Sequence, residues 1–220
     1  MQTIRKSHFI ITVIAIFVML SGCAKKNTTV EEIYHVLEKT VTKEKVFEQQ
    51  QKPLVTLEKK EKNLYNQIIR LGLKQYDQIV KLSNEAIASV NQRKKLMDKE
   101  TKSIEESEQE FKKIKPLIGK LEDPDLRKIT SELADIMSKR YKAHEKLSLE
   151  YNDALKNDKK LYDMFKNKNL PLQELEGQVN KLNKIYKTIS ATNEEFNQLT
   201  EQYNKKKLSF YKKAGLATNK

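Results

Sequence analysis

Apolar residues recur along most of the chain at alternating steps of three and four, a spacing that gathers them on one face of a helix. The pattern runs through residues 30–71, 79–118, 126–165 and 172–210. No stretch alternates apolar and polar residues with a period of two for long enough to form a strand. We therefore expect an all-α protein in which long helices with narrow apolar faces pack as an antiparallel up-and-down bundle.

Two turns between these runs are marked by proline. Asp123 stands before Pro124, an acidic N-cap followed by proline at the first helical position, and Pro171 ends the next polar stretch in the same way. The two prolines bound a helix of roughly 45 residues. The last helix has nearly the same length, extends to about Ala214, and is stopped by Gly215.

The segment 28–121 is compatible with two arrangements. A turn at Gly72 gives two helices of roughly 45 residues each, with Pro53 as a kink in the first. Alternatively, a short helix to about Gln51 precedes one very long helix that begins at Pro53. Equal lengths bury every apolar face along its whole length, so four helices are favoured. The apolar spacing continues through Gly72 with little phase break, so the three-helix version with one overlong helix stays open.

Three tyrosines, Tyr151, Tyr186 and Tyr203, fall on these apolar faces. A buried tyrosine hides its ring and still needs a partner for its hydroxyl. We expect the rings to lie in the bundle core and the hydroxyls to reach its rim.

The first 22 residues have the layout of an export signal. Arg5 and Lys6 precede a mostly apolar run, 8–20, which is shorter than the roughly 20 residues that a membrane-spanning helix needs. The run ends in Leu-Ser-Gly-Cys, the pattern of a bacterial lipoprotein box. In such a box the thiol of Cys23 receives a diacylglyceryl group, and a peptidase cuts just before it.

The anchor predicts the organisation of the mature protein. Two acyl chains hold a protein stably on a bilayer, so Cys23 fixes the chain to the outer face of the cell membrane. We expect four parts, which are a removed lipoprotein signal peptide (1–22), a tether after the lipidated cysteine (23–28), a helical bundle domain (29–214) and a C-terminal tail (215–220).

Charge narrows the choice of partners. Without the signal peptide the chain has 41 basic and 30 acidic residues, a net charge of +11. An excess of this size favours association with polyanions. For an exported protein these are anionic lipids and cell-wall polymers such as teichoic acid or peptidoglycan, and not nucleic acid. Short basic runs occur along all the helices: Lys59-Lys60-Lys62, Arg93-Lys94-Lys95, Lys112-Lys113-Lys115, Lys139-Arg140, Lys159-Lys160 and Lys205-Lys206-Lys207.

Groups that catalysis or metal binding needs are scarce. His35 and His144 are the only histidines of the mature chain, and neither has a histidine or cysteine at ligand spacing. His144 falls on an apolar face, where we expect it to fill the flank of the core. The acidic run 105–110 lacks the glycine-containing loop of a calcium site and is expected to be a solvated helix face. We therefore expect no catalytic residue, metal site or cofactor, and no enzymatic activity.

The chain resembles the YkyA family, cell-wall-binding lipoproteins of low-GC Gram-positive bacteria. The residues that carry the resemblance are the lipoprotein box Leu20-Ser21-Gly22-Cys23 and the stretches Leu64–Gly72, Lys99–Glu105 and Lys139–His144. The resemblance covers essentially the whole mature chain. It implies an all-helical up-and-down bundle on the cell surface with no known enzymatic activity, attached to lipid through Cys23.

The leading functional hypothesis is a membrane-anchored lipoprotein whose basic helical surface binds anionic wall polymers. The alternative is a scaffold that docks another surface protein through an exposed apolar strip. Wall hydrolysis is a third, enzymatic hypothesis, which the missing acid/base pair disfavours. Electrostatic binding predicts that changing Lys205, Lys206 and Lys207 to glutamate weakens wall binding far more than stability.

Overall fold

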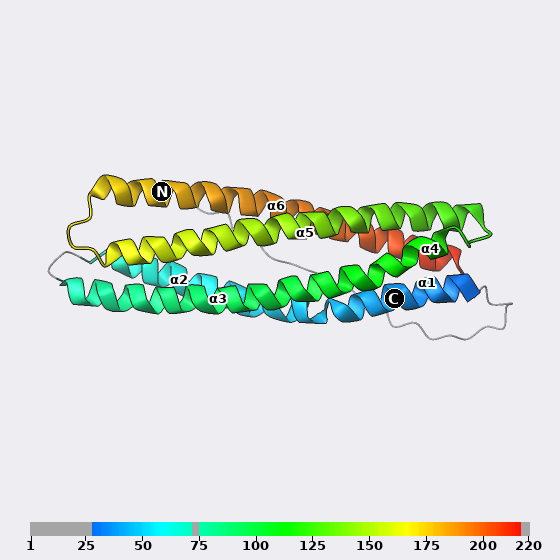
Figure 1. Cartoon of the computed structure of the whole chain (residues 1–220), viewed down its shortest axis with the longest axis horizontal. Coiled ribbons are helices and arrows are strands. Elements are labelled where there is room, and N and C mark those ends of the chain that lie inside the picture. The colour runs from blue at the N-terminus through cyan, green and yellow to red at the C-terminus, as the bar shows by residue number, and fades with distance from the viewer. Residues whose placement is uncertain (1–27, 72–74, 217–220) are drawn as a thin grey trace. The chain divides into compact units, whose positions relative to one another are not determined.

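The computed structural model describes residues 28–71 and 75–216, and all its regular elements are helices (Figure 1). No strand occurs in these two stretches, so the all-α prediction is confirmed. None of the helices described is long and apolar enough to cross a membrane. The elements are α1 (Thr28–Lys43), α2 (Lys45–Ile68), α3 (Tyr76–Phe111), the 3₁₀ turn η2 (Lys112–Ile114), α4 (Lys115–Ile118), α5 (Pro124–Phe165) and α6 (Leu172–Lys213).

The chain reverses direction between α2 and α3, which decides between the two arrangements. The backbone N–H of Leu71 donates to Ile68 O at 3.1 Å and closes the end of α2. Gln51 on α2 contacts Glu100 on α3 at 2.9 Å, and ten residues later Glu61 contacts Arg93 at 2.7 Å. The residue numbers of the contacts rise along α2 while they fall along α3, so the two helices are antiparallel. Four long helical stretches are present, and the three-helix alternative is wrong, although Gly72 itself lies outside the described residues.

The first long helix is interrupted at Glu44 and not at Pro53, which lies inside α2. The cause is a side chain from α3. The Ser103 hydroxyl donates to Lys43 O at 2.6 Å and accepts from the Phe47 N–H at 3.1 Å. It therefore stands between the two groups that an unbroken helix would join directly. A side chain inserted in this way is a known cause of helix kinks.

The predicted cap at the start of α5 and the predicted stop after α6 are confirmed. Asp123 Oδ1 accepts from the backbone N–H groups of Asp125 at 2.7 Å and Leu126 at 3.2 Å, so it caps α5. Beyond α6, Gly215 has φ +68°, a backbone conformation that glycine adopts without strain. The Leu216 N–H donates back to Tyr211 O at 3.0 Å and completes the helix stop.

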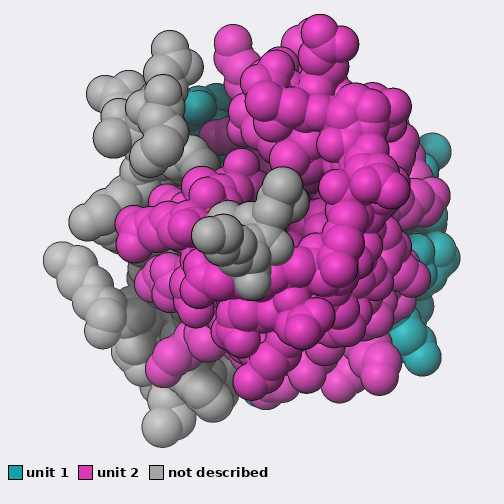
Figure 2. All heavy atoms as spheres, turned by 90° about the vertical axis from the view of Figure 1, so that its left-hand side faces the viewer, with its two compact units in different colours: residues 1–48, 102–145, 193–220 teal, residues 49–101, 146–192 magenta. Residues whose placement is uncertain are grey.

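The described chain forms two compact units, shown in different colours in Figure 2. Unit 1 contains the residues up to 48, 102–145 and from 193, and unit 2 contains 49–101 and 146–192. Each unit has its own apolar core. In unit 1 the Phe47 and Phe196 rings meet edge to face with centres 5.7 Å apart. In unit 2 the core includes Leu64, Ile79, Val90 and Leu155.

Candidate functional site

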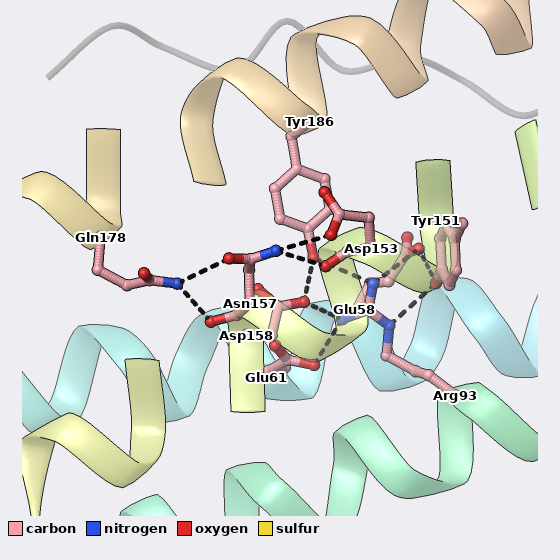
Figure 3. A network of polar contacts seen from close by, with 9 residues as sticks. All are labelled: Glu58, Glu61, Arg93, Tyr151, Asp153, Asn157, Asp158, Gln178 and Tyr186. Carbon is pink, nitrogen blue, oxygen red and sulfur yellow. Dashed lines mark hydrogen bonds and ion pairs between the residues drawn. The ribbon is translucent and has the colours of Figure 1, made fainter. Parts of the chain in front are cut away.

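The centre of unit 2 holds a buried arginine bonded to two acids and two tyrosines (Figure 3). The Arg93 side chain, on α3, is 2% exposed. Its Nη1 donates to Glu61 Oε2 on α2 at 2.7 Å and to Asp158 Oδ2 on α5 at 3.2 Å. Its Nε donates to the Tyr151 hydroxyl at 2.9 Å, and its Nη2 donates to the Tyr186 hydroxyl at 3.2 Å. One guanidinium thus links all four helices of the unit.

The two tyrosines extend this network to further acidic oxygens. The Tyr151 hydroxyl donates to Glu58 Oε1 at 2.7 Å, and the Tyr186 hydroxyl donates to Asp158. Arg93 Cζ also lies 4.9 Å from the centre of the Tyr151 ring, within cation–π distance. Burial raises the pKa of Tyr151 and Tyr186 well above its ordinary value, so both hydroxyls stay protonated and can donate.

Three carboxylates surround this one guanidinium, because Glu58 also lies 3.8 Å from Arg93 Nη2. Burial raises the pKa of Glu61 to about 7, with Arg93 opposing the rise and Asp158 adding to it. Burial likewise raises the pKa of Asp158, again against the effect of Arg93. A network with more negative than positive charge favours an extra proton, and the two buried acids therefore protonate more readily than exposed ones.

A neighbouring amide pair joins α5 to α6 in the same unit (Figure 3). Gln178 Nε2 donates to the backbone oxygen of Asn157 at 2.9 Å and to its Oδ1 at 3.3 Å. Asn157 Nδ2 in turn donates to Asp153 Oδ1 at 3.1 Å. Because each bond needs one particular alignment of the two helices, the pair fixes their register.

Unit 1 contains a second buried arginine. Arg140 on α5, also 2% exposed, grips Glu44 with two bonds, Nη1 to Oε1 at 2.7 Å and Nη2 to Oε2 at 2.8 Å. Its Nε donates to Thr200 Oγ1 at 2.8 Å, and its Cζ lies 4.6 Å from the centre of the Phe196 ring. Ser107 Oγ also donates to Glu44 at 2.8 Å. Glu44 is the residue at which α1 gives way to α2, so this network is centred on the kink.

These networks fix how helices pair, and the groups at their centres are almost fully enclosed. The side chains of Arg93, Glu61 and Asp158 are 2%, 7% and 6% exposed. Removing one partner of a buried ion pair typically costs about 3–5 kcal/mol. No group of three His, Cys, Asp or Glu residues is placed to hold a metal ion in the stretches 28–71 and 75–216.

Most of the net positive charge of the mature chain belongs to unit 2. Its two stretches contain 20 basic and 12 acidic residues, a net charge of +8. The rest of the mature chain contains 21 basic and 18 acidic residues, a net charge of +3. Unit 2 is therefore the stronger attractor of anions.

A shallow depression of about 450 Å³ lies in unit 2 where α5 turns toward α6. Three of the side chains that line it are lysines from the last turns of α5. Its full lining consists of Lys156, Lys159, Lys160, Asp163, Met164, Asn167 and Leu170. We call it the lysine depression.

Comparison with known proteins connects the chain to a group of lipoproteins. Residues 28–213 match the YkyA family, whose description is "Putative cell-wall binding lipoprotein". The chain belongs to the YkyA family. It is 35% identical over 206 residues to the "Uncharacterized lipoprotein YkyA" of Bacillus subtilis (strain 168), an alignment that covers 94% of this chain and 92% of that protein. The family resemblance noted in the sequence is confirmed.

A solved structure shares the fold of this YkyA-family chain. It is the crystal structure of a conserved protein of unknown function from Staphylococcus aureus, with a TM-score of 0.71. The match covers 87% of this chain and 97% of that one at 19% sequence identity. At so low an identity the likeness concerns the fold alone.

The sequence pattern did contain a signal for the two buried arginines of this YkyA-family protein. Arg93 stands three residues after Val90 and four before Met97, so it falls on the apolar face of its helix. Arg140 follows Met137 by the same step of three. Each also belongs to a short basic run, which favours a surface position because arginine is seldom buried without a partner. The partners come from distant parts of the chain, and the local pattern does not name them.

Other predicted residues lie as follows. His144 is buried, with its ring centre 5.8 Å from that of Phe47 in the unit 1 core, and His35 is exposed. In the acidic run, Glu106 pairs with Lys43 at 3.3 Å across two exposed side chains, as on a solvated face. Cys23 lies outside the described residues, and its lipidation stays a prediction.

The expectation that the tyrosine hydroxyls reach the rim was wrong. Those of Tyr151 and Tyr186 bond to the buried Arg93 instead. The Tyr203 hydroxyl in unit 1 is buried and has no hydrogen-bond partner among the described residues. The reason is that buried charges in the core compete with water for the hydroxyls.

The lysine run near the end of α6 is not a free basic patch. Lys205 pairs with Glu201 at 2.6 Å, and Lys206 pairs with Glu132 at 2.6 Å. Lys207 is buried and lies 3.4 Å from Glu38, and burial lowers its pKa. Changing all three to glutamate would bury an acid beside an acid, so the expectation of a small stability loss was wrong.

Proposed function

We propose that this YkyA-family protein is a non-enzymatic lipoprotein that binds anionic cell-wall polymers through the basic surface of unit 2. Diacylglyceryl Cys23 attaches it to the outer face of the membrane. The observation that carries the proposal is the net charge of +8 on unit 2, against +3 on the rest of the mature chain. The family description, cell-wall binding lipoprotein, supports the same class of ligand.

The chemistry of the buried groups supports binding rather than catalysis. General acid–base catalysis needs a titratable group within hydrogen-bond reach of a substrate atom. Glu61 and Asp158 are titratable, but their side chains are almost fully enclosed and already bonded to Arg93. They therefore serve the fold, and the exposed charges remain for contacts with a ligand.

The location that Cys23 implies supports a wall polymer as that ligand. A basic surface outside the membrane meets phosphodiester and peptidoglycan polymers, and its charges act on them over about 8–10 Å at physiological ionic strength. Binding that depends on many such charges must weaken steeply as salt is raised.

Sedimentation of the mature lipidated protein, held in mild detergent micelles, with purified cell walls tests the proposal. We expect binding to walls that carry teichoic acid, weaker binding to walls stripped of it, and progressive release between about 50 mM and about 500 mM salt. Equal binding at low and high salt would contradict an electrostatic mode. In that event docking of another surface protein becomes the better hypothesis.

A further inference from the structure

We infer that the lysine depression of unit 2 binds a linear phosphodiester polymer, so that wall binding has a defined site on the basic surface. The inference rests on the proposed function and specifies where on unit 2 the polymer is held. Lys156, Lys159 and Lys160 supply the charge, and Met164 and Leu170 supply apolar contact beside it.

The three lysines of the depression are unbalanced by acids. Among residues 28–71 and 75–216, no carboxylate lies within ion-pair distance of Lys156, Lys159 or Lys160, whose side chains are exposed. In contrast, Lys205 and Lys206 on α6 each pair with a glutamate at 2.6 Å. An unpaired ammonium gains more from an added anion because it has no bond to an acid to give up.

The one acid in the depression does not cancel this charge. The Lys166 ammonium pairs with Asp163 at 2.7 Å and also donates to Asn84 Oδ1 at 3.3 Å. The carboxylate is therefore neutralised from outside the depression. An anion that enters meets three positive charges and a screened negative one.

The shape of the depression favours a chain over a small enclosed ligand. Residues three and four apart on a helix have Cβ atoms about 5–6 Å apart, so Lys156 neighbours both Lys159 and Lys160. A linear polymer can contact more than one of these lysines at once and leave at either side of an open depression. Phosphate suits the compact lysine ammonium, and the carbon linkages between phosphates can lie against Met164 and Leu170.

The test uses the full mature chain, anchored by its lipid in neutral phosphatidylcholine vesicles. The probe is fluorescent poly(glycerol phosphate), and its binding is measured by co-flotation with the vesicles. One variant carries Lys156→Gln, Lys159→Gln and Lys160→Gln. The control variant carries Lys59→Gln, Lys60→Gln and Lys62→Gln, which removes the same charge from exposed sites on α2 of the same unit.

We expect the depression variant to bind the probe about tenfold more weakly or worse, because it lacks the ammonium groups that contact the phosphates. The control should weaken binding by no more than about twofold. The slope of log Kd against log salt should fall by about two for the loss of three phosphate contacts. Polygalacturonate, which carries carboxylates, should bind more weakly than the phosphate polymer.

Each remaining outcome overturns a different claim. Equal weakening in both variants would overturn the site and leave diffuse wall binding intact. No binding of the probe by the unaltered protein would overturn the proposed function itself. A fluorophore attached to Met164→Cys tests whether the depression contacts a lipid surface instead. If its emission responded to phosphatidylglycerol vesicles but not to the polymer, the depression would face the membrane, and the inference would be wrong.

Discussion

Arg93 is one cation among three nearby carboxylates, so replacing it should lower the stability of the fold. Arg93→Met leaves Glu61 and Asp158 buried without a cation, and we expect the free energy of unfolding to fall by about 3–5 kcal/mol. Lys95→Met, at an exposed site on the same helix, should change it by less than about 0.5 kcal/mol. Urea unfolding of both variants measures the difference. A loss below about 1 kcal/mol for Arg93→Met would contradict the network.

The raised pKa of Glu61 makes stability depend on pH in a direction opposite to most acids. The folded protein holds the proton up to about pH 7, whereas an unfolded glutamate releases it near its ordinary value of 4.5. Folding therefore binds a proton in this window, and stability is greatest below it and falls as pH rises through 7. Asp158 contributes with the same sign. Hydrogen bonds lower the pKa values of Asp123 and Glu132, so these two acids affect stability only when the pH falls below the ordinary pKa of an acid.

We accordingly expect the urea midpoint to be higher at about pH 5 than at about pH 7.5, equivalent to about 1–3 kcal/mol. Glu61→Gln should remove most of this difference. Glu176→Gln, which deletes one exposed carboxylate, should preserve it. A protein that is more stable at the higher pH would show that Arg93 keeps Glu61 ionised.

On the scale of elements, the kink between α1 and α2 depends on one hydroxyl. Ser103→Ala removes its bonds to Lys43 O and the Phe47 N–H, and we expect a loss of about 1–2 kcal/mol. Ser83 on the same helix is buried with no partner for its hydroxyl among the described residues. Ser83→Ala should therefore be neutral or slightly stabilising. Thermal unfolding compares the two, and equal effects would mean that the Ser103 bonds contribute nothing.

Pro53 gives a second prediction at this scale. It lies exposed inside α2, where proline lacks the N–H that an alanine would donate. We expect Pro53→Ala to raise the free energy of unfolding by about 1–2 kcal/mol, because part of the roughly 3 kcal/mol helix penalty is offset by the freer unfolded chain. Denaturant unfolding measures it. A loss of stability would indicate that proline at this position is needed for the packing of α2.

Helix ends could be predicted from sequence because their causes are local. Asp123 caps the helix that follows it, and Gly215 adopts the positive φ that stops the one before it. The kink could not be predicted in the same way. Its cause, Ser103, lies 60 residues after Lys43. The local sequence around a helical serine does not indicate which distant backbone group its hydroxyl will bond. The lysine depression was visible only as the pair Lys159-Lys160, because its shape depends on the turn to α6.

On the scale of the whole molecule, the predicted lipid anchor at Cys23 can be tested without reference to the fold. Cys23 is the only cysteine, so Cys23→Ala leaves no thiol for a lipid. Cells fed a fatty-acid analogue should label the unaltered protein and not the variant, whose precursor should stay uncut. Label that persisted in Cys23→Ala would show that the lipoprotein prediction is wrong.

If the protein is exported as its sequence predicts, the way the chain is shared between the two units determines the order in which they can be completed. Unit 2 needs no residue beyond 192, whereas unit 1 joins its first helix to the final segment of α6. There Glu38 accepts from the Tyr211 hydroxyl at 2.6 Å. A chain that crosses a membrane from its N-terminus therefore has every residue of unit 2 outside before the segment of α6 that contacts α1 has emerged. With Cys23 as the predicted lipid anchor, α1 is the first of the described helices to emerge and among the last to be covered.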